Sequence, residues 1–127
     1  MTYHFSKKLQ LPMADAVAKV TEALKGQGFG ILTQIDVQQT LKAKLDVDFR
    51  PYLILGACNP GLAHRALLAE DKIGTMLPCN VIVQQHDGRT EVAAIDPVAS
   101  MQAVKNASLQ PVADEVRALL KSAIEQL

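Results

Sequence analysis

The stretch YLILGACNPGLAHRAL, residues 52–67, contains the strand-to-helix transition on which the fold depends. Its first part, Tyr52–Cys58, is apolar on both alternating faces, as is typical of a strand buried on both sides within a sheet. Asn59 is then a good helix N-cap, and Pro60 suits the first helical position because its ring fixes φ near the helical value. We therefore predict a strand in the centre of a sheet that passes directly into a helix.

The helix that begins at Pro60 is apolar almost all round. Leucine and alanine fill most of its positions, and only a narrow polar flank remains at His64 and Arg65. A helix of this composition is packed on more than one side or is covered by another subunit. The position of His64 on the polar flank favours a solvated or interface histidine over a catalytic base.

Outward from this stretch, hydrophobic spacing predicts one domain, residues 1–127, with strands and helices in alternation. Further strands are predicted at residues 2–6, 29–35 and 92–95, and another strand is predicted to start with residues 81–83. Further helices are predicted to begin at Pro12 and after Asp36, and to cover residues 97–104 and 112–127. One face of the second strand is predicted to carry Phe29, Ile31, Thr33 and Ile35. Residues 46–50 fit either a loop or the start of the central strand.

The fold class follows from the order of these elements. Asp87-Gly88 between two apolar runs predicts a tight hairpin turn, so at least part of the sheet is antiparallel. The order is strand, helix, strand, short helix, strand, helix, strand, strand, helix. We therefore predict a mixed α+β fold, in which helices pack on a single mixed or antiparallel sheet.

Composition narrows the function. The chain has 127 residues, 49% of them apolar, and its 13 basic residues balance 13 acidic ones, which argues against nucleic-acid and anionic-membrane partners. No apolar run approaches the roughly 20 residues that span a bilayer, and the first residues do not resemble a signal peptide. Two cysteines in such a chain predict free thiols in the cytoplasm.

Several motifs together resemble a known family. They are Gly56–Pro60 (GACNP), Leu62-Ala63, Leu77–Asn80 (LPCN) before a valine-rich strand, and Ile95–Pro97 (IDP). This pattern resembles the bacterial and archaeal family catalogued as domain of unknown function 302, over nearly the whole chain. The resemblance implies a TBP-like α/β fold and a homodimer, and it implies no established reaction.

The cysteines are the most chemically distinctive residues. Cys58 lies where the strand becomes a helix, and a helix N-terminus favours a thiolate with a lowered pKa. The competing interpretation is that cysteine is a small, commonly buried residue that ends a central strand. Cys79 repeats the Cys-Asn pattern, so the two thiols could form a redox couple if their strands are neighbours. Two cysteines are half of a zinc site, and no metal or other cofactor is predicted.

Three polar residues complete the candidate site. Asn59 and Asn80 could orient a polar ligand, but helix capping and turn bonding explain them equally well. Asp96 lies at a strand end and also fits a helix cap. We therefore expect a homodimeric small-ligand-binding protein, rather than an enzyme, whose site is formed by Cys58, Asn59, Cys79, Asn80 and Asp96. Alternatives are a thiol-dependent enzyme or redox protein using Cys58 and Cys79, with His64 or Asp96 moving protons, and an interaction module with packed cysteines.

Overall fold

The computed structural model describes residues 2–127 and contains a five-stranded, fully antiparallel sheet. The strands in chain order are β1 (His4–Leu9), β2 (Gly30–Asp36), β3 (Tyr52–Cys58), β4 (Cys79–His86) and β5 (Arg89–Ile95). Their order across the sheet is β1-β5-β4-β3-β2, so β1 and β2 are the edge strands. The predicted mixed α+β class and the predicted element order are confirmed.

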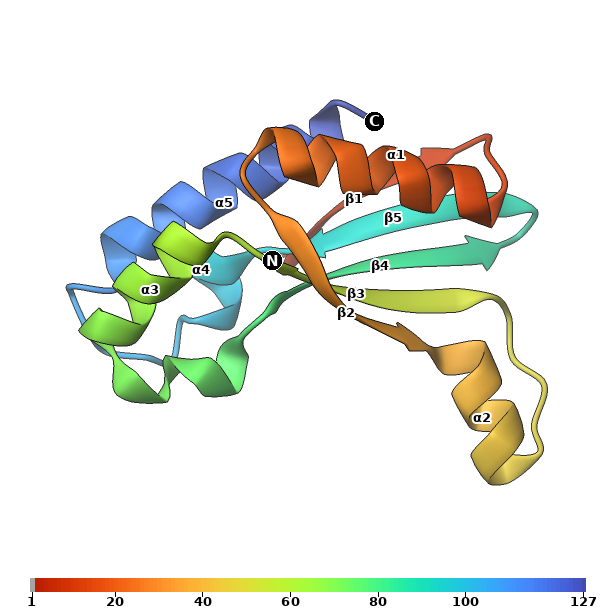
Figure 1. The fold of residues 1–127 in the computed structure, drawn as a ribbon, viewed down its shortest axis with the longest axis horizontal. Helices are drawn as coiled ribbons and strands as arrows, with labels where there is room; N and C mark the ends of the chain where they lie inside the picture. The colour runs from red at the N-terminus through yellow and green to blue at the C-terminus, as the bar shows by residue number, and fades with distance from the viewer. Residues whose placement is uncertain (1) are drawn as a thin grey trace.

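The helices form a second layer and two extensions (Figure 1). They are α1 (Met13–Gly26), α2 (Val37–Leu45), α3 (Pro60–Ala69), the 3-10 helix η1 (Asp71–Met76), α4 (Pro97–Ser100) and α5 (Gln110–Glu125). The long helices α1 and α5 lie along one face of the sheet, whereas α3, η1 and α4 gather at one end of it. Helix α2 projects from the opposite end and buries none of its residues.

The core lies between the sheet and the two long helices. Residues that pair across antiparallel strands share a face, and the pairs Leu55↔Val81 and Val83↔Val92 are almost completely buried. Val20 and Leu24 of α1 and Leu120 of α5 are inaccessible to solvent. Because both helices present their apolar stripe to this one face, burial of these side chains supplies most of the driving force for folding.

The hairpin between β4 and β5 forms as predicted. Asp87 and Gly88 both have positive φ, 51° and 73°, which is the backbone twist that joins two antiparallel strands by a two-residue turn. Helix α3 likewise begins at Pro60, and α2 begins after Asp36, whose side chain accepts a hydrogen bond from the Gln39 amide. Residues 46–50 form neither helix nor strand.

Three predicted details are wrong. The strand Tyr52–Cys58 is interior, but the middle of the sheet is β4, since β2 adds at the edge beyond β3. The helix expected to reach residue 104 ends at Ser100, because Met101 takes a non-helical conformation. In β2, Ile31 pairs with Ala57 and Thr33 with Gly56, so Ile31 and Thr33 face opposite sides of the sheet. A β-bulge between them breaks the expected alternation.

Candidate functional site

A cavity of about 380 Å³ lies at the end of the sheet where β3 passes into α3. Most of its wall comes from four elements: the last residues of β3, the first residue of β4, the inner side of α3 and the first half of α5. Its lining is almost entirely apolar and includes Phe29, Leu62, Ala66, Leu77, Val112 and Val116. Pockets that bind small molecules have volumes of roughly 300–1,000 Å³, so this cavity is large enough for a ligand.

The turn from β3 into α3 is fixed by Asn59. Its Oδ1 accepts a hydrogen bond from the Leu62 amide at 3.3 Å, and its Nδ2 donates to the Gln27 carbonyl at 3.4 Å. The first bond caps α3, and the second joins this turn to the turn that ends α1. Asn59 lines the cavity, but both its Oδ1 and its Nδ2 already make hydrogen bonds to the backbone.

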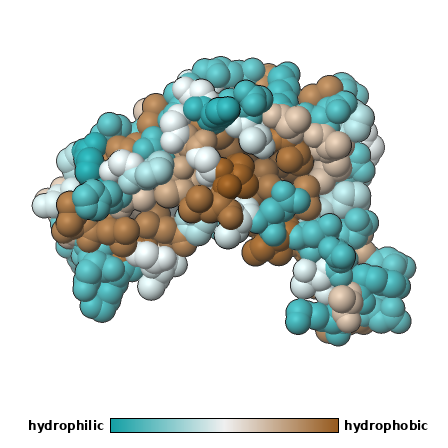
Figure 2. All heavy atoms as spheres, in the orientation of Figure 1, coloured by the Kyte–Doolittle hydropathy of each residue, from teal (hydrophilic) through white to brown (hydrophobic). Residues whose placement is uncertain are grey.

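The mouth of the cavity is apolar and open to solvent. Leu32, the extra residue of the β2 bulge, lines the cavity and is 68% exposed, and Leu67 of α3 lines it with 42% exposure. Figure 2 shows hydrophobic atoms extending from the middle of the view toward its left edge, where Figure 1 draws β2, α3 and η1. The bulge thus turns a leucine of an edge strand toward the candidate site.

Cys79 and Cys58 both line this cavity. Cys79 pairs with Ala57 across β3 and β4, on the core face, and is only 7% exposed. Burial, and to a smaller extent the neighbouring Cys58, raises the pKa of the Cys79 thiol from 9.0 to about 11. Cys79 is therefore a neutral thiol at physiological pH and a poor nucleophile there.

Cys58 is half-buried at the last position of β3. Both thiols are free, so the structure contains no disulfide and does not show the expected cysteine pair.

Asn80 lies on the other side of the sheet. It pairs with Gly56 across β3 and β4, and it lines a separate hollow on the open sheet face together with Tyr52 and His4. Because side chains alternate along a strand, consecutive residues Cys79 and Asn80 point to opposite faces. The two Cys-Asn motifs therefore do not bring their asparagines together.

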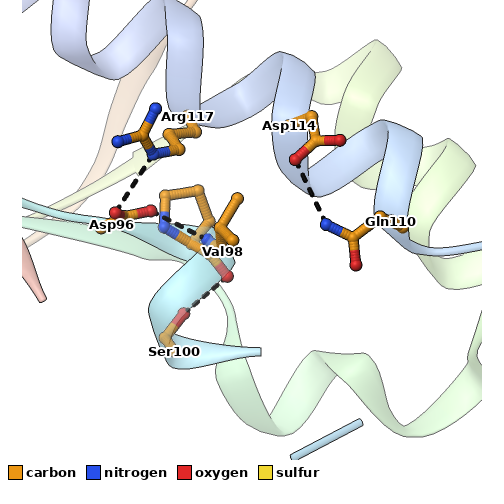
Figure 3. A network of polar contacts seen from close by, with 7 residues as sticks. Asp96, Val98, Ser100, Gln110, Asp114 and Arg117 are labelled. Atoms are coloured by element: carbon orange, nitrogen blue, oxygen red, sulfur yellow. Dashed lines mark hydrogen bonds and ion pairs between the residues drawn. The ribbon is translucent and has the colours of Figure 1, made fainter. Parts of the chain in front are cut away.

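Asp96 belongs to a structural network between α4 and α5 (Figure 3). Its Oδ1 accepts a hydrogen bond from the Val98 amide at 3.0 Å, which caps α4, and its Oδ2 accepts one from Arg117 Nε at 3.2 Å. His64 is exposed on the outer side of α3 and is not among the residues that line the cavity. The geometry thus groups Cys58, Asn59 and Cys79, and separates Asn80, Asp96 and His64 from them.

Within residues 2–127, no three side chains of His, Cys, Asp or Glu are placed to hold a metal ion. The same residues include no helix with the length and hydrophobicity required to cross a bilayer.

Sequence reasoning missed most of the cavity wall. Phe29 follows the end of α1, Leu32 lies on the bulge, and Met101 follows α4. In sequence these residues are ordinary apolar positions without a motif. Leu32 alone gives a signal, because an apolar residue at this position interrupts the apolar–polar alternation of the strand. A bulge explains this interruption, but a strand with two apolar faces would show the same pattern.

Comparisons with known proteins agree with this fold. The family model described as "Domain of unknown function DUF302" matches residues 5–127. The chain is also similar to an uncharacterized conserved DUF302 protein from Bacillus stearothermophilus whose crystal structure is known. The two share 28% sequence identity with a TM-score of 0.92, and the match covers 99% of this chain and 98% of that one. No curated protein matches the chain.

Proposed function

The chain belongs to the DUF302 family, and we propose that it binds a small, predominantly apolar molecule in the cavity between β3, α3 and α5. The observation that carries the proposal is the cavity itself, about 380 Å³ with an almost wholly apolar lining and an open mouth. An engineered apolar cavity of roughly 150 Å³ already admits benzene. Ligand burial here would remove apolar surface from water on both the ligand and the protein.

The site residues proposed from the sequence take different roles in this scheme. Cys58 and Cys79 contribute sulfur-containing wall, and Asn59 keeps the β3–α3 turn in place. Asn80 and Asp96 act outside the cavity, in the sheet face and the α4 cap. Binding needs neither thiolate chemistry nor a charged group.

The test is binding of the uncharged fluorescent probe N-phenyl-1-naphthylamine to the whole chain. Ala63 lines the cavity and is half-buried, so Ala63→Phe should occupy the space and abolish saturable binding. Ala69→Phe is the matched control, because Ala69 is also half-buried on α3 but does not line the cavity. A cooperative thermal unfolding transition is required of both variants, so that a loss of binding is not a loss of folding. Absence of saturable binding to the wild type, or unchanged binding to Ala63→Phe, would overturn the proposal.

We further propose that the chain forms a homodimer through the outer surface of α3. Leu68 there is 75% exposed, which supports an apolar contact with another copy. A net charge of zero also leaves no overall repulsion between two copies.

Analytical ultracentrifugation tests this directly. Leu68→Glu should convert a dimer into a monomer, whereas Leu45→Glu, an equally conspicuous exposed leucine on α2, should not. A wild-type monomer at all concentrations would contradict the dimer, and a monomer produced only by Leu45→Glu would exclude the α3 interface.

A further inference from the structure

We propose that the ligand of this cavity is an uncharged aromatic molecule of about two fused rings. The inference rests on the proposed function and specifies its ligand class. Three properties of the wall carry it: the chemistry of its polar groups, its sulfur and aromatic content, and its size.

The wall excludes a charged ligand. Among residues 2–127, those that line the cavity include none with a charged side chain. Asn59 is the one amide side chain of the lining, and its Oδ1 and Nδ2 are both engaged, with the Leu62 amide and the Gln27 carbonyl. A carboxylate or ammonium group buried here would lose its hydration without finding a partner, and that loss is far larger than the gain from apolar contact.

The wall is rich in sulfur. The chain has four methionines and two cysteines, and three of these six residues, Cys58, Cys79 and Met101, line the cavity. Sulfur makes favourable contacts with aromatic rings that a saturated hydrocarbon does not reproduce. Phe29 is buried in the same wall and offers a ring for edge-to-face or offset contact with a second ring. These groups favour an aromatic ligand over an aliphatic one of the same shape.

The size of the cavity sets the number of rings. A volume of about 380 Å³ is more than twice the roughly 150 Å³ that accommodates a single benzene ring. A fused bicyclic molecule therefore fills it better than one ring does.

The proposed ligand class is tested by displacement of bound N-phenyl-1-naphthylamine with three compounds that share a fused two-ring framework. They are 1-naphthol, decahydro-1-naphthol and 1-naphthoate. If area alone governed binding, the saturated alcohol would bind at least as tightly as 1-naphthol, because it exposes more apolar surface. We expect 1-naphthol to bind about two- to tenfold more tightly for each sulfur contact it makes. We expect 1-naphthoate to cause no displacement at concentrations where 1-naphthol displaces the probe fully.

Two matched variants test whether sulfur in the cavity wall causes the preference for the aromatic compound. Met101→Leu keeps the side-chain volume and removes the sulfur, so it should lower the affinity for 1-naphthol about two- to tenfold and leave decahydro-1-naphthol unchanged. Met76→Leu is the control, because Met76 is exposed and does not line the cavity.

Failure of this inference is distinguishable from failure of the proposed function. If the probe binds saturably but the saturated alcohol competes as well as 1-naphthol, or if 1-naphthoate competes equally, the aromatic, uncharged class is wrong and the cavity still binds apolar molecules. If none of the three compounds displaces a bound probe, the class is also wrong. If the probe does not bind, both proposals fall.

Discussion

The buried Cys79 thiol should make the stability of this protein depend on pH above neutrality. Its pKa is about 11 in the folded chain, against 9.0 when burial and Cys58 do not act on it. The folded state therefore holds this proton more tightly than the unfolded state does. The resulting stability is fully present below pH 9 and is lost progressively as the pH rises toward 11.

The magnitude follows from the size of the shift. Each pKa unit corresponds to about 1.4 kcal/mol, so a rise from 9.0 to about 11 corresponds to about 2–3 kcal/mol of free energy of unfolding. Alkaline pH also affects ionisations that the wild type and a Cys79 variant share. The quantity to measure is therefore the difference in free energy of unfolding between the wild type and Cys79→Ala, by urea denaturation at several values between pH 8 and pH 11. As the pH rises from 8 to 11, the wild type should lose about 2–3 kcal/mol more stability than Cys79→Ala, because only the wild type carries this ionisation.

A Cys58→Ala background separates the two causes of the shift. Burial is the larger cause, so most of the pH dependence should remain when Cys58 is replaced. In Cys58→Ser, where Cys79 is the only thiol and burial alone raises its pKa, alkylation at pH 8 should be more than about tenfold and less than about one hundredfold slower in the folded than in the unfolded chain from the thiolate fraction alone. A pH-independent difference between wild type and Cys79→Ala, or alkylation within tenfold of the unfolded rate, would refute the placement of this thiol in the apolar wall.

Three further changes test the local geometry, each by urea denaturation. Asn59→Ala should lower the free energy of unfolding by about 1 kcal/mol through loss of the α3 cap, and Asn59→Ser should recover most of it; equal losses would show that the cap is not the cause. Gly28→Ala should destabilise the chain, since Gly28 has a φ of 85° and the added Cβ would lie 2.9 Å from Asn59 Nδ2. Gly26→Ala is the control: Gly26 lies in helix α1 and an added Cβ there would have no neighbour within 4 Å, so this change should be neutral or stabilising by up to about 1 kcal/mol. Asp96→Ala should cost more than Arg117→Ala, because Asp96 both caps α4 and pairs with Arg117, and the reverse order would contradict that double role.

Local signals in the sequence identified the elements well where a single residue type sets the backbone. Pro60 and Asn59 start α3, Asp36 caps α2, and Asp87-Gly88 makes the hairpin turn. In each case the chemistry that fixes the conformation lies within a few neighbouring residues, so the sequence contains all of it.

The candidate site was only partly predictable. The Cys-Asn motifs drew attention to Cys58, Asn59 and Cys79, which the fold places around one cavity. They also pointed to Asn80, which lies on the other face of the sheet because consecutive side chains of a strand alternate between faces. Asp96 was ambiguous in sequence between an acid and a helix cap, and its bonds to Val98 and Arg117 give it the second role.

By itself, the sequence determined the class of fold, the helix starts, the hairpin and the balance of charge, because these depend on local backbone preference and on the spacing of apolar residues. Only the tertiary structure decided that β4 is the middle strand, that a bulge turns Leu32 toward the mouth of the cavity, and that Phe29, Met101 and α5 close a cavity beside Cys79. These features depend on contacts between segments far apart in the chain. Packing of the whole sheet and its helices decides which distant residues a side chain contacts. The residues next to it in the sequence carry no pattern that identifies those partners.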